Sequence, residues 1–411
     1  MARSDLAAQA RSLQPRTVAL RRAIHRRPEV GLALPHTRDA ILHALADLPL
    51  QVHLGVGVSS VVAVLDGARP GPTVLLRGDM DALPMQEVTG LPYASEIDGR
   101  MHACGHDTHV AMLASAARLL VSRRSELSGR VLFMFQPGEE GFHGARYMID
   151  EGLLDPTGPA GRPDSAFALH ISATLPAGEV HLRAGALMAA ADTIRVTVRG
   201  RGGHASAPSD ALDPVPAAAA MVGALQTAMT REVGPHDPSV LTIAHISAGT
   251  TDNVIPETAF MEGTVRTLSE DVRLQVREIV RRVCTHTALA HGCSADVVVD
   301  PGYPVTVNDA DAADRIEIVA RTTLGAHRVA RMPSPILGAE DFSYVLAQVP
   351  GALAFLGGCP AGTEPSTAAP NHSNRVVFDE AAMAAGVAVY AGLALDALAA
   401  PRPGPTTPLS G

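Results

Sequence analysis

No lysine and no tryptophan occur in this chain of 411 residues, and aromatic residues make up only 3% of it. All 33 basic residues are therefore arginines. This absence excludes Schiff-base catalysis by lysine and a phosphate loop of the Gly-Lys-Ser/Thr type, because both depend on a lysine amine. The Gly-x-Ser-x-Gly elbow of many serine hydrolases and the His-Glu-x-x-His helix of many zinc peptidases are also missing.

Cysteines and long apolar segments are few. The four cysteines show no disulfide-framework spacing, and the N-terminal residues lack the apolar core of a secretion signal, so we expect a cytoplasmic location. The longest nearly apolar run, 381–395, is shorter than the roughly 20 residues that cross a bilayer, so we expect a buried helix and no membrane partner. A net charge of -9 argues against a nucleic-acid partner.

Length and hydrophobic periodicity predict two domains. The first 182 residues alternate apolar strands with amphipathic helices, as in an α/β sheet with parallel pairs. The strands are expected near 60–66, 73–80, 130–136 and 165–170. The order then changes to β-α-β-β-α-β, the pattern of a ferredoxin-like α+β fold. Its elements are expected at 192–200, 213–230, 239–248, 257–267, 270–291 and 295–299.

We therefore expect a discontinuous α/β domain, 1–182 plus 298–398, interrupted by an inserted lid or dimerisation domain, 183–297. The proline-rich end, 399–411, is predicted to be a disordered tail.

The segment 101–109, Met-His-Ala-Cys-Gly-His-Asp-Thr-His, concentrates side chains that bind metals. A single histidine is more often a solvated residue than a ligand. Cys104 and His106, however, are one residue apart, and on an extended segment they would point to the same side, toward one ion. Thiolate, imidazole and carboxylate together suit zinc, manganese or cobalt, so we expect a metal site here.

Acidic and imidazole side chains follow three predicted strands. Asp79 and Asp81 come after the strand near 73–80, Glu139 and Glu140 after the strand near 130–136, and His170 ends the strand near 165–170. Ligands of α/β sheets gather at the carboxyl ends of strands. The adjacent Glu139 and Glu140, flanked by glycines, can point in different directions. One can bind metal while the other moves protons, although a pair of solvated loop acids is the common alternative.

The chain resembles a known family, the dinuclear metallohydrolases that include aminoacylases and carboxypeptidases, and within it the amidohydrolase branch of hippurate hydrolase and the auxin–amino-acid conjugate hydrolases. The resemblance covers almost the whole chain and follows eight motifs in order. These are Arg77-Gly-Asp-Met-Asp-Ala-Leu-Pro84, Met101-His-Ala-Cys-Gly-His-Asp107, Gln136-Pro-Gly-Glu-Glu-Gly141, Ala168-Leu-His170, Gly202-Gly-His-Ala-Ser-Ala-Pro208, Asn253-Val-Ile-Pro256, Gly338-Ala-Glu-Asp-Phe342 and Asn371-His372.

The resemblance implies a mixed-sheet, zinc-exopeptidase-like catalytic domain and two divalent metal ions per subunit. It implies that Cys104 bridges the ions and that four further residues complete the ligand set: His106, Glu140, His170 and His372. Glu139 becomes the general acid and base, and Asp81 orients an imidazole ligand. His102 and His109 are expected to be structural or supporting histidines, and Asp107 is expected to cap a helix that begins near Thr108.

The resemblance also assigns residues of the insert. His204 is expected to reach the active site of the partner subunit in a homodimer or higher homo-oligomer and to polarise the scissile carbonyl. Asn253 and Arg266 are expected to hold the substrate's carboxylate or oxyanion.

The predicted activity is a metal-dependent amidohydrolase that cleaves the amide of small N-acyl-L-amino acids. A metal-dependent dipeptidase is the alternative within the fold, and a catalytically silent metal-binding scaffold is the alternative outside it. After His170 this chain continues Ile-Ser-Ala-Thr-Leu-Pro, where relatives carry a bulkier segment that includes an aromatic residue. With so few aromatics, we expect small or aliphatic acyl groups.

Overall fold

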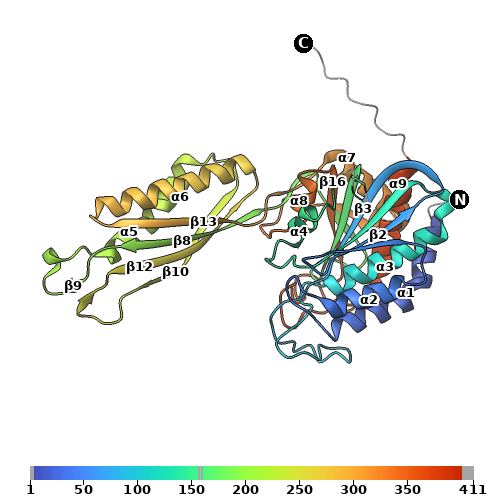
Figure 1. Cartoon of the computed structure of the whole chain (residues 1–411), viewed down its shortest axis with the longest axis horizontal. Helices are drawn as coiled ribbons and strands as arrows, with labels where there is room; N and C mark the ends of the chain where they lie inside the picture. The colour runs from blue at the N-terminus through green and yellow to red at the C-terminus, as the bar shows by residue number, and fades with distance from the viewer. Residues whose placement is uncertain (1–3, 156–157, 159–160, 400–411) are drawn as a thin grey trace, which may run out of the picture. The chain divides into compact units, whose positions relative to one another are not determined.

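The chain folds into two units, each with its own sheet (Figure 1). The computed structural model describes residues 4–155, 158 and 161–399. The first unit comprises the described residues up to Gly185, together with Val307–Ser334 and the described residues from Tyr344 onward. The second unit comprises Ala186–Thr306 and Pro335–Ser343.

An eight-stranded mixed sheet forms the centre of the first unit. In sheet order its strands are β1 (Gln51–Leu54), β2 (Val61–Asp66), β4 (Ser128–Gln136), β3 (Arg69–Asp79), β5 (Ser165–Ser172), β16 (Gly351–Gly357), β6 (Val180–Leu182) and β15 (Val329–Arg331). The central strands β4, β3, β5 and β16 run parallel to one another, whereas at one edge β2 pairs antiparallel with β4 and β1 pairs antiparallel with β2. The sheet is therefore of the mixed α/β kind that the sequence predicts.

The central strands are buried because helices cover the sheet. All residues from Val131 to Gln136 in β4 and from Ala166 to Ile171 in β5 are buried, which explains why both strands read as continuous apolar runs. The helices of this unit are α1 (Ser4–His25), α2 (Pro35–Leu45), α3 (His106–Ser122), α4 (Gly144–Asp150), α7 (Ala310–Leu324) and α9 (Met383–Ala399), with short 3₁₀ turns η1 (Arg124–Glu126), η3 (Ala326–Arg328) and η4 (Glu380–Ala382). Helices α1, α3, α7 and α9 pack on one another, and α3 and α9 contact β3.

The last helical segment, Glu380–Ala399, is 20 residues long and by length and composition alone could cross a membrane. The expected apolar run, 381–395, was thus too short an estimate of this helix. Within the structure 72% of its apolar 18-residue stretch is buried, in contact with the other helices and the sheet. The segment packs as the core helix of the first unit. Ala399, the first residue of the predicted tail, ends this helix, and residues 400–411 lie outside the described residues.

The second unit is a four-stranded antiparallel sheet with two helices. Its strands lie in the order β10 (Ser239–Ala248), β12 (Thr258–Thr267), β8 (Ala190–Arg199) and β13 (Ser294–Pro301). Helices α5 (Pro214–Glu232) and α6 (Glu270–Ala290) pack against this sheet and against each other. This order and connection are those of a ferredoxin-like fold. The short elements β9 (Gly203–His204), η2 (Pro208–Asp210) and β11 (Val254–Ile255) complete the unit, and β7 (Gly185–Met188), β14 (Thr306–Asn308) and the short helix α8 (Ser343–Leu346) lie where the chain passes between the units.

The observed elements of the insert lie within two residues of their predicted bounds. In the first unit β3 begins at Arg69, four residues before the predicted start, and a register shift between Arg69 and Thr73 accommodates its Pro-Gly-Pro segment. The second unit extends to Thr306, beyond the expected boundary at 297, because β13 pairs with β8 as far as Pro301. The roles of the insert as a lid and as a dimerisation domain stay predictions.

Candidate metal centre

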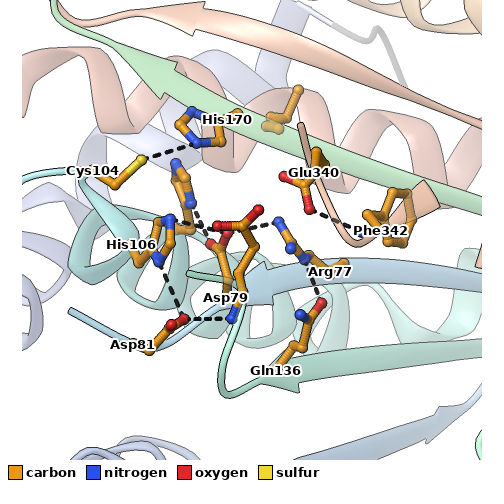
Figure 2. A network of polar contacts seen from close by, with 12 residues as sticks. Arg77, Asp79, Asp81, Cys104, His106, Gln136, His170, Glu340 and Phe342 are labelled. Atoms are coloured by element: carbon orange, nitrogen blue, oxygen red, sulfur yellow. Dashed lines mark hydrogen bonds and ion pairs between the residues drawn. The ribbon is translucent and has the colours of Figure 1, made fainter. Parts of the chain in front are cut away.

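The candidate metal-binding side chains gather at the carboxyl ends of the parallel strands of the first unit (Figure 2). Asp79 ends β3 and Asp81 follows it, Glu139 and Glu140 follow β4, and His170 lies near the end of β5. This edge is where ligands of α/β sheets are bound. All of these side chains except Glu140 are more than 90% buried.

A turn at Gly105, rather than an extended segment, brings Cys104 and His106 to one ion position. Gly105 has φ +89°, in the left-handed region, and His106 already begins α3. A Cβ atom at Gly105 would lie 2.5 Å from Cγ2 of Ile171, so only glycine fits. Cys104 and His106 therefore approach one position through this turn and not along an extended segment. The reason is that α3 begins at His106, two residues before the expected start near Thr108.

Two groups of potential ligands share Cys104. Cys104, His106 and His170 form one group, and Cys104, Glu140 and His372 form the other, each with ligand atoms within 4.8 Å of one another. Sγ of Cys104 lies 3.4 Å from Nε2 of His170 and 3.3 Å from Nε2 of His372, and Nε2 of His372 lies 3.2 Å from Oε1 of Glu140. The structure therefore brings together all five side chains predicted as ligands.

Buried ring nitrogens without regular hydrogen bonds and a strongly raised imidazole pKa mark this cluster as a place for positive charge. Both ring nitrogens of His106 are buried and make no hydrogen bond of regular geometry to any described residue; the nearest carboxylate oxygens, of Asp79 and Asp81, lie 3.3 and 3.4 Å away. Burial raises the pKa of the Cys104 thiol. Hydrogen bonds to Cys104 and Glu140 raise the pKa of His372 to about 10. Such a set of soft and hard donors fits zinc, manganese or cobalt.

Asp81 ties the cluster to the loop after β4. Its two carboxylate oxygens accept the backbone N–H groups of Glu139 and Glu140, both at 2.9 Å, and Oδ1 lies 3.4 Å from Nδ1 of His106. One carboxylate thus faces both the loop and an imidazole, which is the arrangement expected of a group that orients a ligand. Asp79, which was noted only as an acid at a strand end, lies 3.3 Å from Nε2 of His106.

Glu139 lies beside the cluster on a tightly closed loop. The N–H of Gly141 donates to the carbonyl of Glu139 at 2.8 Å, and the N–H of Gly144 donates to the carbonyl of Gly138 at 3.0 Å. The carboxylate of Glu139 has an oxygen within 4.8 Å of ligand atoms of both His106 and Glu140. The side chain is 6% exposed, so it faces the cluster rather than bulk water.

His372 is held by its neighbour Asn371, whose role the sequence did not single out. The amide Nδ2 of Asn371 donates to the carbonyls of Cys104 at 3.0 Å and Ile171 at 2.9 Å, and its Oδ1 accepts the N–H of Ala173 at 3.0 Å. His372 itself has φ +67°, a strained conformation for a non-glycine residue. In the sequence, the position of Asn371 directly before His372 was the only feature that could have indicated this role.

The three remaining predicted site residues lie in the second unit. His204 in β9 pairs with Val254 in β11, and the N–H of Ala205 donates to the carbonyl of Asn253 at 3.0 Å, so the His204 and Asn253 segments are neighbours. His204 is exposed and its Nδ1 accepts the N–H of Ser206 at 3.1 Å. Arg266 in β12 is half-buried, and burial lowers the pKa of its guanidinium. Their roles stay predictions.

Asp107 does not cap α3. It lies within the first turn, and its Oδ2 accepts hydrogen bonds from Nε of Arg21 at 2.9 Å and from Nδ1 of His25 at 2.8 Å. The residue at the cap position is Gly105, which has no side chain to offer.

Imidazole, thiol and carboxylate side chains that cluster at the carboxyl edge of a mixed α/β sheet form a site suited to metal-assisted hydrolysis. Residues 75–396 match peptidase family M20/M25/M40, and the chain belongs to this family. It is 36% identical to thermostable carboxypeptidase 1 of Saccharolobus solfataricus over 94% of this chain and 96% of that protein. It is 35% identical to N-acetylcysteine deacetylase of Bacillus subtilis over 94% of this chain and 97% of that protein.

A solved structure supports the same relationship. A Bacillus subtilis protein described as a dinuclear metal-binding peptidase of the M20 family superposes with a TM-score of 0.81 and 32% identity, over 95% of this chain and 99% of that one. The protein is thus an M20-family metal-dependent hydrolase of amide bonds, as the resemblance implied.

Proposed function

We propose that this enzyme hydrolyses N-acyl-L-amino acids to a carboxylic acid and a free amino acid. The observation that carries the proposal is the position of Glu139. A buried carboxylate lies beside two ligand groups that share Cys104, and a site that only stored metal would need no additional proton carrier.

In this proposal the two ligand groups would hold two divalent ions, with Cys104 common to both groups. His106 and His170 would complete one group, and Glu140 and His372 the other. A shared thiolate offsets part of the charge of two cations held close together. When bound, such ions supply Lewis acidity to a water molecule and to the amide carbonyl.

Glu139 is the general base and then the general acid. Its carboxylate accepts a proton from the attacking water and delivers that proton to the amide nitrogen as the carbon–nitrogen bond breaks, so that the amino acid leaves as an amine. Asp81 keeps Glu139 and Glu140 in place through their backbone N–H groups. In the second unit, His204 from the partner subunit polarises the carbonyl, and Asn253 and Arg266 bind the substrate's carboxylate or oxyanion.

The similarity to N-acetylcysteine deacetylase supports an N-acyl amino acid as substrate. The similarity to thermostable carboxypeptidase 1 supports the competing assignment, cleavage of a dipeptide. A small or aliphatic acyl group agrees with the low aromatic content of the chain. We infer a small-molecule substrate, a homodimer or higher homo-oligomer, and a cytoplasmic location.

The test is release of free amino acids from a panel of N-acetyl, N-benzoyl and longer N-acyl amino acids and of dipeptides. The panel is measured before and after chelation, and again after separate addition of zinc, manganese and cobalt. Chelator-sensitive cleavage of acyl amino acids is expected. Preferred cleavage of dipeptides would reassign the enzyme as a dipeptidase, and stoichiometric metal without any turnover would favour a binding scaffold.

A matched pair of variants tests the role of Glu139. Glu139→Gln should lower kcat by at least about 100-fold, because general acid–base catalysis contributes that much or more, while metal content stays at the parent value. Glu278→Gln, an exposed change of the same kind on α6, should leave kcat unchanged. Loss of metal from Glu139→Gln would assign this residue to the ligand set instead.

A further inference from the structure

His109 is a fully buried histidine between two of the proposed metal ligands, and the proposed function gives it no role. It lies on α3, three residues after His106, so both side chains project from the same face of the helix. The ring centroid of His109 lies 5.4 Å from that of His106 and 4.8 Å from that of His170. The ring therefore fills the space behind both imidazoles.

The hydrogen bonds of His109 define its tautomer. The backbone N–H of Ile171 is only a donor, and it donates to Nε2 of His109 at 2.7 Å. Nε2 is therefore unprotonated, and the ring hydrogen is on Nδ1, which donates to Oδ1 of Asp79 at 2.5 Å. Both nitrogens are used in this way, so neither has a lone pair left for a metal ion.

These two hydrogen bonds join three elements of the metal centre. Asp79 ends β3, and its other oxygen, Oδ2, lies 3.3 Å from Nε2 of His106 and accepts a hydrogen bond from Nη1 of Arg77 at 2.7 Å (Figure 2). Ile171 belongs to β5 and directly follows His170. The ring of His109 thus connects α3 to the end of β3 on one side and to the end of β5 on the other.

We propose that His109 is a positioning residue that sets the separation and orientation of His106 and His170 in the metal centre. This inference rests on the ligand roles given to those two histidines in the proposed function. Groups that hold metal ligands in this way typically contribute a factor of about 10–100 to metal affinity, so the effect is measurable without any catalytic assay.

The two halves of the bridge can be separated by substitution. His109→Asn places an amide donor near the position of Nδ1 and so keeps the contact with Asp79, but it is too short to reach the N–H of Ile171. His109→Gln places an amide oxygen near the position of Nε2 and so keeps the contact with Ile171, but it loses the contact with Asp79. His109→Ala loses both. His43, exposed on α2, supplies the control for each substitution.

The readouts are cobalt(II) affinity, from competition with a chelator, and the absorption spectrum of the cobalt-substituted enzyme. The spectrum reports ligand geometry through the d–d bands and the thiolate charge-transfer band. His109→Ala is expected to weaken cobalt binding by about 10–100-fold and to shift the d–d bands, while His109→Asn and His109→Gln each recover part of the loss. The His43 variants should match the parent.

Parent-like affinity and spectra in all three His109 variants would overturn the inference. Lower thermal stability with an unchanged cobalt spectrum would also overturn it, because a merely structural residue would give that result. If the parent enzyme itself binds no cobalt, zinc or manganese, the proposed function fails rather than the role of His109 alone.

Discussion

Replacing Asp107 by asparagine should remove a pH-dependent part of the stability of the first unit. Asp107 is fully buried and accepts hydrogen bonds from Arg21 and His25, both of α1. Burial disfavours a charged His25, but the Asp107 carboxylate and a hydrogen bond to Glu87 outweigh it and raise the pKa of His25 to about 9. Burial by itself would raise the pKa of the Asp107 carboxyl, but the charges of Arg21 and His25 hold that pKa well below its usual range.

The sign and size of the effect follow from these values. Because the pKa of His25 is higher in the folded protein than its ordinary value of 6.5, the folded state holds the proton more tightly. The resulting stabilisation is fully present below pH 6.5 and is lost as the pH rises through about 9. At about 1.4 kcal/mol per pH unit, the part that is lost amounts to about 3 kcal/mol.

The assay is calorimetric melting, with hydrogen exchange of α1 and α3 to localise the change, at pH 6.5 and pH 9.5 on chelated protein. Chelation matters because metal affinity also depends on pH. The parent should lose stability across this range. Asp107→Asn should be less stable by about 3–5 kcal/mol at pH 6.5, since it leaves a buried charge without its partner, and should show no such pH dependence.

Asp311→Asn, an exposed change of the same kind on α7, should behave as the parent. The reasoning would be refuted if the parent kept its full stability to pH 9.5, or if Asp107→Asn retained the pH dependence of the parent.

Three further predictions concern the metal centre and the subunits. Gly105→Ala should lower stability by roughly 1–3 kcal/mol through strain at φ +89° and the close approach to Ile171; unchanged melting would contradict the turn geometry. Cys104→Ala should remove most bound metal, as measured by elemental analysis, and parental metal content would contradict its bridging role. Inactive Glu139→Gln and His204→Ala subunits, mixed and re-equilibrated, should recover up to about a quarter of parental activity in hybrid dimers; no recovery would count against a His204 that acts across subunits.

The family and the α/β class could be predicted because their signals are local in sequence. Buried parallel strands require long apolar runs, and a ferredoxin-like unit requires a fixed order of strands and helices, so the elements of the insert were placed within two residues. The metal-binding residue types were visible for the same reason, because Cys104, His106 and the pair Glu139 and Glu140 each belong to a short motif.

The details of the centre could not be predicted because they depend on contacts between distant segments. Asn371 forms hydrogen bonds with the carbonyls of residues 104 and 171, and His109 forms hydrogen bonds with Asp79 and Ile171. The residues next to Asn371 and His109 in the sequence give no indication of these partners. Asp107 was expected to cap a helix. Its true partners, Arg21 and His25, could not be predicted because they lie more than 80 residues away in the sequence.

The sequence by itself determined which chemical groups the protein carries and the order in which strands and helices follow one another, because apolar periodicity and ligand motifs are written in neighbouring residues. Only the tertiary structure decided how those groups meet. Parallel pairing of β3, β4 and β5 aligns their carboxyl ends, and that alignment places Glu140 and His170 beside Cys104, which lies just before the start of α3. Hydrogen-bonded side chains from segments far apart in the chain then hold them there.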